Sequence, residues 1–455
     1  MISQKASPIA DSILQGNLIK LMFKLSVPSI LGVLLLTLNA FIDALFAGRF
    51  IGETALAGIS LALPFTLIIQ GFADFVGTGS ASVISRAIGS KDVQTQSKIF
   101  GNLIVISFVI SVLITAIGYG YSKELIMLMG GSGAVALEGT SYLSVYTIGT
   151  IFFIIGKALG QVISSEGKIR WTTISMLIFV TVNICLNYLF VAVYDGGSAK
   201  LALATDMAMI VASAINLGYF IYGKSSIPVN FKKLAIASNL LPEIFSVGIG
   251  SLLYPVMMLI QEFVVFNSIS NYGTNNDIAF FGAAGEIISL AFIPVFGVSQ
   301  ALQPVIGMNY GAKQNKRIKK AYTIFAIFSI ILLLLIWLPL QLSPKTFLNL
   351  ILPGITFTEN DILNFRILSV FTPIGTLTYF SITLFMALGK GQIILRLIIL
   401  RIIVLNVPFV LLFSKLFRIK GIYLGLLIAD LIFVVIVFFL TFSEFRKLNN
   451  FKVKS

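Results

Sequence analysis

The feature that most constrains this chain is the recurrence of long apolar stretches along almost its whole length. A helix needs about 20 mostly apolar residues to cross the hydrocarbon core of a bilayer. Twelve stretches of that kind lie between residues 25 and 442, and they leave no room for a large soluble domain. Of the 455 residues, 57% are apolar and 11% are charged, and the mean hydropathy is +0.99. The sequence therefore predicts an all-α polytopic membrane protein and excludes a soluble globular fold.

The distribution of charge predicts the orientation of these helices. The chain has 32 Lys and Arg against 18 Asp and Glu, which gives a net charge of +14. Most of the cations lie in alternate connections and at the two ends of the chain, with a dense cluster at 313–320. Cytoplasmic segments of membrane proteins carry such an excess of Lys and Arg. We therefore expect a bacterial cytoplasmic (inner) membrane protein with both termini in the cytoplasm. Its basic connections would face anionic lipid headgroups, with no nucleic acid as a partner.

The residue types that are absent or rare exclude several kinds of chemistry. Histidine is absent and cysteine occurs once, at Cys185, so histidine-based catalytic triads, Cys/His zinc sites and disulfides within the chain are excluded. No Walker motif or Gly-rich phosphate loop is present. We expect a protein that is not an enzyme and that has no cofactor, so any coupling to H⁺ or Na⁺ must use carboxylates.

An internal repeat divides the chain into two halves. Short signatures recur 222 residues apart, among them Gly89 to Lys91 with Gly311 to Lys313, and Gly167-Lys168 with Gly389-Lys390. Six helices in each half make the repeats parallel, related by an axis along the membrane normal. Such an arrangement favours alternating access by two lobes. The predicted divisions are a cytoplasmic segment at 1–24, an N-lobe at 25–222, a cytoplasmic linker at 223–242, a C-lobe at 243–442 and a cytoplasmic tail at 443–455.

Seven short segments, spread over both halves of the chain, form a set of motifs. They are LSVPSIL at 25–31, FIDALFAG at 41–48, ALAGISLALP at 55–64, GTGSASVISR at 77–86, GSKD at 89–92, QPVIGMNYGAK at 303–313 and ALGK at 387–390. These segments resemble those of one family of transporters, the MATE (multidrug and toxic compound extrusion) family, in its DinF/MepA-like bacterial branch. The resemblance covers about 25–442 and implies a V-shaped pair of six-helix lobes. It also implies export of cationic or amphipathic compounds in exchange for H⁺ or Na⁺.

The resemblance also implies which residues bind the coupling cation. The family links coupling to an Asp in an Asp-x-x-Phe-x-Gly segment of the first helix, and that position here is Asp43. A second acid is usual on the fifth helix, where this chain has Asn183 and Asn187, so fewer coupling protons are expected. Some members use acids on the seventh and tenth helices. The seventh offers Glu262 here and the tenth offers none.

The physics of the bilayer selects Asp43 independently, because a carboxylate inside a span needs a functional or structural reason to be there. Asn39 lies one turn earlier on the same helix face and can orient the carboxylate or help to bind a cation. Pro28 removes a backbone hydrogen bond and can act as a hinge. The alternative is an Asp that reaches the outer interface near Arg49. If the coupling ion is Na⁺, Asp43 and Glu262 are the alternative sites for it.

Other charged and aromatic residues inside the spans are candidates for a substrate cavity. Asp74 and Lys157 lie at comparable depth, so they predict a structural ion pair, with contact to substrate as the alternative. Asp206 and Asp430 occupy equivalent places in the two halves, which predicts a shared scaffold role, whereas Arg401 lies near a helix end and can reach the interface. Apolar and cation–π contacts would involve aromatic side chains. The remaining cavity candidates are Glu286, Phe263, Phe266, Tyr379 and Phe380.

Two other functions fit the pattern less well. A flippase for lipid-linked saccharides needs cations in its cavity, and only Lys157 lies deep enough. A receptor or scaffold without transport activity does not account for the parallel repeat. The leading hypothesis is therefore a monomeric, cation-coupled exporter of cationic or amphipathic small molecules.

Overall fold

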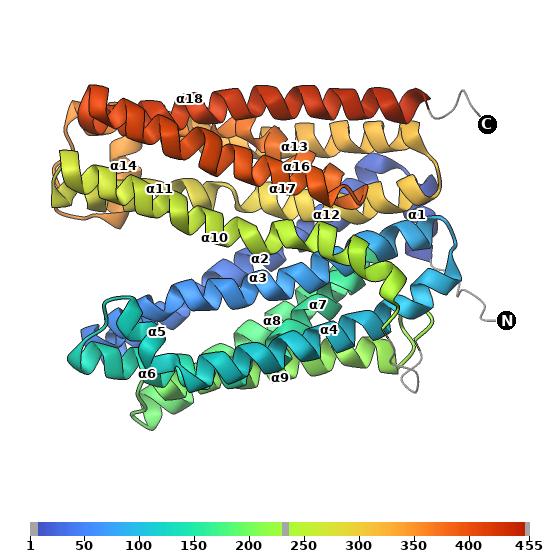
Figure 1. Cartoon of the computed structure of the whole chain (residues 1–455), viewed down its shortest axis with the longest axis horizontal. Helices are drawn as coiled ribbons and strands as arrows, with labels where there is room; N and C mark the ends of the chain where they lie inside the picture. The colour runs from blue at the N-terminus through green and yellow to red at the C-terminus, as the bar shows by residue number, and fades with distance from the viewer. Residues whose placement is uncertain (1–7, 230–235, 451–455) are drawn as a thin grey trace.

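The computed structural model describes residues 8–229 and 236–450, and this part of the chain is almost entirely helical, without strands. The helices form two bundles that converge at the end carrying both termini, called here the terminal end, and diverge at the other, called the open end (Figure 1). The N-lobe consists of α1 (Pro8–Gln15), α2 (Leu18–Phe46), η1 (Ala47–Ile51), α3 (Glu53–Gly89), α4 (Val93–Gly120), α5 (Ser122–Leu128), α6 (Gly133–Ile148), α7 (Thr150–Ser165), α8 (Ile169–Asn187), η2 (Tyr188–Val193) and α9 (Ser198–Ile221).

The C-lobe repeats the order of the spans, with the bent pair α11 and α12 in the place of the single helix α3. It begins with a short 3₁₀ turn, η3 (Ser238–Leu240), after the connection between the lobes. Its helices are α10 (Leu241–Tyr272), α11 (Asn275–Ala291), α12 (Ile293–Gly311), α13 (Asn315–Leu342), α14 (Pro344–Ile351), α15 (Glu359–Ser369), α16 (Thr372–Ala387), α17 (Gly391–Ile399), η4 (Leu400–Asn406) and α18 (Val407–Asn450).

The described residues contain twelve spanning helices, as the sequence predicts. Nine elements are long and apolar enough to cross a membrane, and two bent pairs, α6 with α7 and α11 with α12, add one span each. The last element, Gly391–Asn449, holds two spans because the backbone turns back at Arg418, whose φ of 52° and ψ of −132° are not helical. Large apolar side chains such as Leu113, Leu335 and Phe439 are more than half exposed, which suits contact with lipid rather than with water.

The two repeats agree residue by residue at the helix ends. Adding 222 to the first residues of α3, α4, α7 and α8 gives the first residues of α11, α13, α16 and α17. Lys91 and Lys313 share a left-handed backbone with φ of 58° and 57°, and Gly167 and Gly389 have φ of 81° and 75°. Each repeat also contains a π-helical segment, η2 or η4, in its fifth span. The local sequence signals at the helix ends therefore fold in the same way twice.

Several helix boundaries differ from the divisions expected from hydropathy. Asn17 caps α2 by accepting hydrogen bonds from the backbone N–H of Ile19 and Lys20, so the first long helix begins at Leu18, before the expected residue 25. The last helix continues to Asn450, into the expected tail. These ends are polar, so apolar length alone does not locate them. Parts of the expected segments, at 1–7, 230–235 and 451–455, lie outside the described residues.

The short helix α1 touches both lobes at the terminal end. Ile9 and Ile13 pack beside Gly167 of the N-lobe. From the C-lobe, Arg317 donates from Nε to the Ile13 carbonyl at 3.0 Å and from Nη2 to the Gly16 carbonyl at 2.5 Å. A cation at a helix C-terminus also interacts favourably with the helix dipole. The segment before the first span is therefore packed against both halves of the molecule.

Candidate functional site

Asp43 lies toward the open end of α2, where its half-buried carboxylate accepts hydrogen bonds from two amides. Asn39 donates from Nδ2 to Oδ2 at 3.1 Å, and Asn187 donates from Nδ2 to Oδ1 at 2.7 Å. The same Asn187 amide donates to Asn183 Oδ1 at 3.0 Å, and Asn183 Nδ2 donates to Thr205 Oγ1 at 3.1 Å. These five residues form a chain of polar contacts across α2, α8 and α9, which we call the Asp43 relay.

The local backbone places the Asp43 relay beside two irregular segments. The π-helical turn η1 begins four residues after Asp43, and η2 begins directly after Asn187. Such π-helical turns occur often at functional sites, because they redirect side chains within an otherwise regular helix. Behind the relay, the rings of Tyr142 and Tyr146 stack at 5.8 Å and are almost fully buried.

The relay has the oxygen atoms that a small hard cation needs. Two amide oxygens, Asn39 Oδ1 and Asn187 Oδ1, are buried and lack a hydrogen-bond partner within the described residues. Buried polar atoms are normally paired, so unpaired oxygens next to a carboxylate suggest an occupant. Carboxylate and amide oxygens suit a hard cation, and the same carboxylate can instead bind a proton. No group of three or more Asp, Glu or Cys side chains with metal-site spacing occurs in the described part of the chain.

The equivalent place in the C-lobe is uncharged. Asn406, which corresponds to Asn183, donates from Nδ2 to Oε1 of Gln261 at 2.7 Å, and Gln261 corresponds to Asn39. The positions that correspond to Asp43 and Asn187 are Val265 and Val410, which are 1% and 0% exposed. Both lobes thus carry an amide at each of these two positions. The amides bond directly to each other in the C-lobe, whereas in the N-lobe Asn39 bonds to the carboxylate of Asp43.

The C-lobe candidate Glu262 does not belong to this amide pair. Its side chain is exposed on α10, and it forms no ion pair with any described residue. Glu286 on α11 is likewise exposed. Pro28 lies inside α2 without breaking it, and its carbonyl accepts a hydrogen bond from Thr173 Oγ1 at 2.7 Å.

Asp74 and Lys157 form the ion pair that the sequence predicts. Lys157 Nζ lies 2.8 Å from the Asp74 carboxylate, and both side chains are less than one-third exposed. Gln161 donates to Asp74 Oδ1 at 2.6 Å and accepts from Thr78 Oγ1 at 2.9 Å. The ammonium group also lies 5.7 Å from the centre of the Phe153 ring. The pair is therefore held on several sides and fixes α3 against α7.

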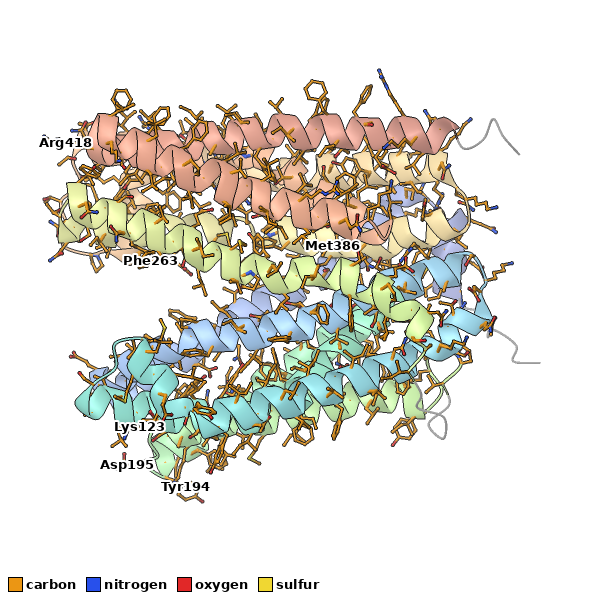
Figure 2. The ribbon with its side chains drawn as sticks, in the orientation of Figure 1. Lys123, Tyr194, Asp195, Phe263, Met386 and Arg418 are labelled. Atoms are coloured by element: carbon orange, nitrogen blue, oxygen red, sulfur yellow. The ribbon has the colours of Figure 1, made fainter. Side chains whose placement is uncertain are left out.

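The aromatic candidates lie in different environments. Phe263 is 70% exposed and lies on the part of α10 that borders the space between the diverging lobes (Figure 2). Phe266 packs edge-on against Phe281, with 5.6 Å between the ring centroids, and the ring centroids of Tyr379 and Phe292 lie 5.3 Å apart. Phe380, in contrast, is fully buried and packs in the core of the C-lobe.

The equivalent acids Asp206 and Asp430 do not share a role. Asp430 accepts a hydrogen bond from Arg401 Nε at 3.1 Å, whereas Asp206 forms no ion pair among the described residues. The expectation of a common scaffold role was therefore wrong. Arg401 pairs with Asp430 inside its own lobe, and its guanidinium lies 5.6 Å from the centroid of the Phe433 ring. Its side chain therefore does not extend to the membrane interface, contrary to what the sequence suggests. The difference arises because the C-lobe supplies Arg401 beside Asp430, and no described cation takes that place beside Asp206.

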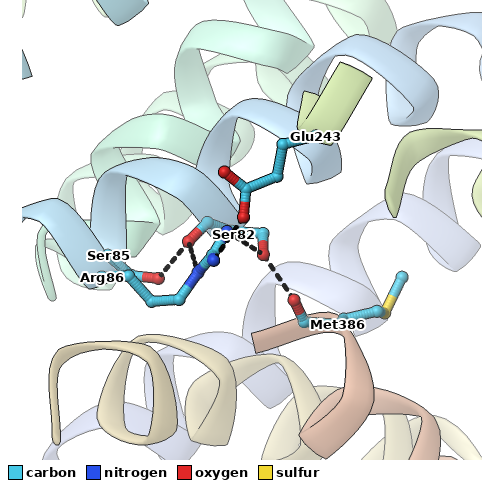
Figure 3. A network of polar contacts seen from close by, with 5 residues as sticks. All are labelled: Ser82, Ser85, Arg86, Glu243 and Met386. Carbon is cyan, nitrogen blue, oxygen red and sulfur yellow. Dashed lines mark hydrogen bonds and ion pairs between the residues drawn. The ribbon is translucent and has the colours of Figure 1, made fainter. Parts of the chain in front are cut away.

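The two lobes are joined near the terminal end by polar contacts that sequence analysis missed. Arg86 of α3 forms an ion pair with Glu243 of α10, and its Nε donates to the Ser82 carbonyl at 3.0 Å (Figure 3). The Ser82 hydroxyl donates to the carbonyl of Met386 on α16. Gly389 allows this approach, because a Cβ there would lie 2.6 Å from Arg86 Nη1. We call this group of contacts the terminal seam.

Two glycines related by the repeat bring the lobes together beside the terminal seam. A Cβ on Gly89 would lie 2.0 Å from the carbonyl oxygen of Met308, and one on Gly311 would lie 2.1 Å from that of Arg86. Met308 and Gly311 follow Arg86 and Gly89 by 222 residues, so the two contacts are equivalent. Only glycine fits such an approach of two backbones. The repeated Gly-x-Lys signature is therefore explained by contact between the lobes.

Glu166 is a second feature that sequence analysis missed. This residue follows α7 and is 1% exposed. Its carboxylate accepts hydrogen bonds from Ser225 Oγ at 2.7 Å, from Ser226 N and Oγ at 2.7 Å each, and from Tyr219 Oη at 3.2 Å. Burial raises the pKa of Glu166 above its usual value of 4.5. These bonds fix the start of the segment that connects the two lobes.

Comparisons with known proteins agree with this architecture. The MatE family model matches residues 28–189 and 247–412. The chain is 25% identical over 297 residues to the multidrug export protein MepA of Staphylococcus aureus strain MSSA476, a match that covers 65% of this chain and 66% of that protein. MepA of Staphylococcus haemolyticus is 25% identical over 302 residues, which cover 66% of this chain and 67% of that protein. The chain thus spans about two-thirds of the length of the curated relatives it matches.

Solved structures share the whole fold. A crystal structure of MATE in the bent conformation superposes with a TM-score of 0.92 at 22% identity, covering 99% of this chain and all of the other. An outward-facing multidrug resistance MATE transporter of the MOP superfamily gives a TM-score of 0.90 at 22% identity, covering 98% of this chain and 100% of that one. Both family-model segments carry the motifs and helix ends described above. The chain therefore belongs to the MatE family, the MATE transporters, and is of the MepA-like kind.

Proposed function

We propose that this protein is a secondary active multidrug exporter, which moves cationic or amphipathic small molecules outward in exchange for H⁺ or Na⁺. The observation that carries the proposal is the Asp43 relay, a single carboxylate with unpaired amide oxygens inside a spanning bundle. An intramembrane carboxylate of this kind is a functional-site hypothesis by default. The relatives named multidrug export protein support the same activity.

In this proposal the cation and the substrate bias two arrangements of the lobes. The lobes diverge at the end opposite the termini, so with both termini in the cytoplasm the structure corresponds to an outward-facing state (Figure 1). A bound cation can shift the equilibrium only by its difference in affinity for the two states. Asp43 would bind it with help from Asn39, Asn183 and Asn187, while Pro28 lets α2 bend. Glu262 is retained as a C-lobe candidate for Na⁺.

The proposed substrate cavity lies between the lobes. Phe263, Phe266 and Tyr379 would supply apolar and cation–π contact, and Glu286 would supply a charge that attracts cations. The Asp74–Lys157 pair would lie at the inner part of this cavity. Because Asp74 neutralises Lys157, that cation is less available for the pyrophosphate of a lipid-linked saccharide, which disfavours a flippase. We further propose a monomer in a bacterial cytoplasmic membrane, surrounded by lipid, with cytoplasmic termini.

The test uses the purified full-length chain in liposomes loaded with ethidium, a cationic dye. Dye movement is followed under an imposed pH gradient and, separately, under an imposed Na⁺ gradient. The proposal expects one of the two gradients to drive the dye against its concentration. Absence of movement with either gradient, together with movement of a labelled lipid-linked headgroup, would support the flippase instead.

A further inference from the structure

Asp206 is a buried acid in the N-lobe that the Asp43 relay does not include. It lies on the third turn of α9 and is only 5% exposed. Among the described residues, its Oδ1 atom has no side-chain hydrogen-bond partner, and no Lys or Arg forms an ion pair with it. The carboxyl group does accept a hydrogen bond from the backbone of Gly149. Asp74 is paired with Lys157 and Asp430 with Arg401, but no such cation faces Asp206 among the described residues. Burying an unpaired carboxylate is unfavourable, so a bound cation or a bound proton is expected to neutralise it.

The fold makes room for this carboxyl group at a break in a neighbouring helix. Gly149 lies between α6 and α7, which bend by 54°. The Gly149 backbone faces the carboxyl group, and a Cβ on Gly149 would lie 2.0 Å from Asp206 Oδ1. Next to it in the chain, Thr205 is the last member of the Asp43 relay and contacts Asn183. Asp206 therefore follows directly in the chain after the last residue of the Asp43 relay.

The groups that face Asp206 from neighbouring helices do not supply a positive charge. Tyr142 and Tyr146 of α6 interact electrostatically with both Asp206 and Asp43. The α8 side chain nearest in the relay is the neutral Asn183, and the α7 cation Lys157 is engaged by Asp74.

Two further charged groups lie on elements packed against α9. Glu138 of α6 accepts a hydrogen bond from Ser198 at the start of α9, and Arg49 of η1 is exposed. Neither forms an ion pair with Asp206. The described groups around Asp206 therefore supply no positive charge that would stabilise its ionised form.

We propose that Asp206 is a second proton-binding residue of the N-lobe, which takes up one proton and releases it in each transport cycle together with Asp43. This proposal rests on the proposed exporter function in its H⁺-coupled form. Each carboxylate accepts one proton from the outside to become a neutral acid, and each returns one proton to the cytoplasm. Two protons then exchange for one substrate cation. Asp206 would thus replace the acid that the fifth helix lacks at Asn187, and the reduced number of coupling protons expected from the sequence would not apply.

The charge balance gives a sharp test with ethidium, which carries one positive charge. Exchange of two protons for one ethidium moves net charge, whereas exchange of one proton for one ethidium does not. We expect a membrane potential, imposed with valinomycin and K⁺ at equal pH, to drive ethidium exchange by the wild-type protein. In Asp206→Asn the number of protons per dye falls by a factor of two, and the response to the potential disappears while the pH gradient still drives the dye.

The matched control is Asp195→Asn, which removes an acid from an exposed loop at the open end of the same lobe (Figure 2). Asn also tolerates the φ of 49° found at this position. The control should keep the response to the potential. If Asp206→Asn responds to the potential as the wild type does, Asp206 is not a coupling residue. A wild type driven by Na⁺ alone also overturns this inference but leaves the exporter proposal intact, whereas a wild type that moves no dye contradicts the exporter proposal itself.

Asp206→Glu covers the case in which Asp206→Asn does not fold. This variant keeps the carboxyl group and displaces it by one methylene in a tightly filled site. We expect it to retain the response to the potential while the pH midpoint of exchange shifts. An unchanged midpoint would contradict a coupling role.

Discussion

The carboxylate of Asp43 is held from a second helix by Asn187, whose amide donates a hydrogen bond of 2.7 Å to Oδ1. The two residues are 144 positions apart, so the bond ties the first spanning helix to the fifth. A hydrogen bond to a charged group contributes about 1.5–3 kcal/mol. In the proposed mechanism, binding of H⁺ or Na⁺ at Asp43 would thereby be linked to how α2 packs against α8.

Asn187→Ala removes this donor without removing the carboxylate. We expect the cation concentration that half-saturates transport to change by about tenfold, because the lost bond is worth roughly 1.5 kcal/mol or more. The measurement is the initial rate of ethidium exchange across a series of pH values and Na⁺ concentrations. Asn271→Ala, an exposed amide on α10, serves as the control. A half-saturation value equal to that of the wild type would show that Asn187 does not act on the coupling site.

Lys157→Met leaves Asp74 without its cation in a partly buried place. We expect the melting temperature in detergent to fall, with a loss of about 1–3 kcal/mol in the free energy of unfolding. The double variant with Asp74→Leu removes both charges and should recover most of the loss. If the losses in the free energy of unfolding of the two single variants simply add in the double variant, the two residues are not coupled.

The terminal seam is expected to stabilise the state that the structure presents. Arg86→Gln removes the ion pair with Glu243 and leaves that carboxylate without its partner. We expect a larger population in which the lobes approach each other at the open end. Spin labels on Lys123→Cys and Lys415→Cys, in a Cys185→Ser background, report this distance. Both sites are exposed, and they lie in different lobes, on α5 and α18. The double variant Arg86→Glu with Glu243→Arg exchanges the two charges and should restore the wild-type distribution of distances between the labels. If Arg86→Gln leaves this distribution unchanged, the terminal seam does not stabilise the state in which the lobes diverge.

The architecture follows from local signals, which is why most of it can be predicted from the sequence. Apolar length gives the spans, and the nearly constant offset of 222 to 224 residues gives the two lobes, because the capping and turn residues recur with it. Asn39 and Asp43 are one helical turn apart, so their contact follows from helix geometry. The Asp74–Lys157 pair follows from depth, because an acid and a base at equal depth in a bilayer stabilise each other.

The contacts that could not be predicted depend on how helices rotate and meet. Arg86 and Glu243 lie near the ends of their helices, where hydropathy predicts solvated charges, and their pairing requires the two lobes to touch at the terminal seam. Arg401 and Asp430 look independent in sequence and meet only because η4 and α18 pack side by side. Glu166 lies in a short polar connection, and its burial results from the chain that folds over it.

Glu166 makes stability depend on pH in a definite direction. Its pKa in the folded protein is raised above 4.5, so the folded state binds the proton more tightly than the unfolded state does. The stabilising effect of this proton is complete below the unfolded pKa and is lost as the pH rises through the folded pKa. As the pH rises above 4.5, the melting temperature of the wild type should therefore fall relative to that of Glu166→Gln. Parallel melting curves of the two proteins across this range would contradict a titrating Glu166.

The central claim is that Asp43 couples cation movement to substrate export, and Asp43→Asn tests it most directly. This variant keeps a polar side chain of the same size and removes the only charge in the relay. In liposomes under the gradient that drives the wild type, we predict that accumulation of ethidium against its concentration falls by at least tenfold. Binding of the dye to the purified variant, followed by fluorescence, should persist. Uphill accumulation by Asp43→Asn at the wild-type rate and with the wild-type dependence on the gradient would contradict the account.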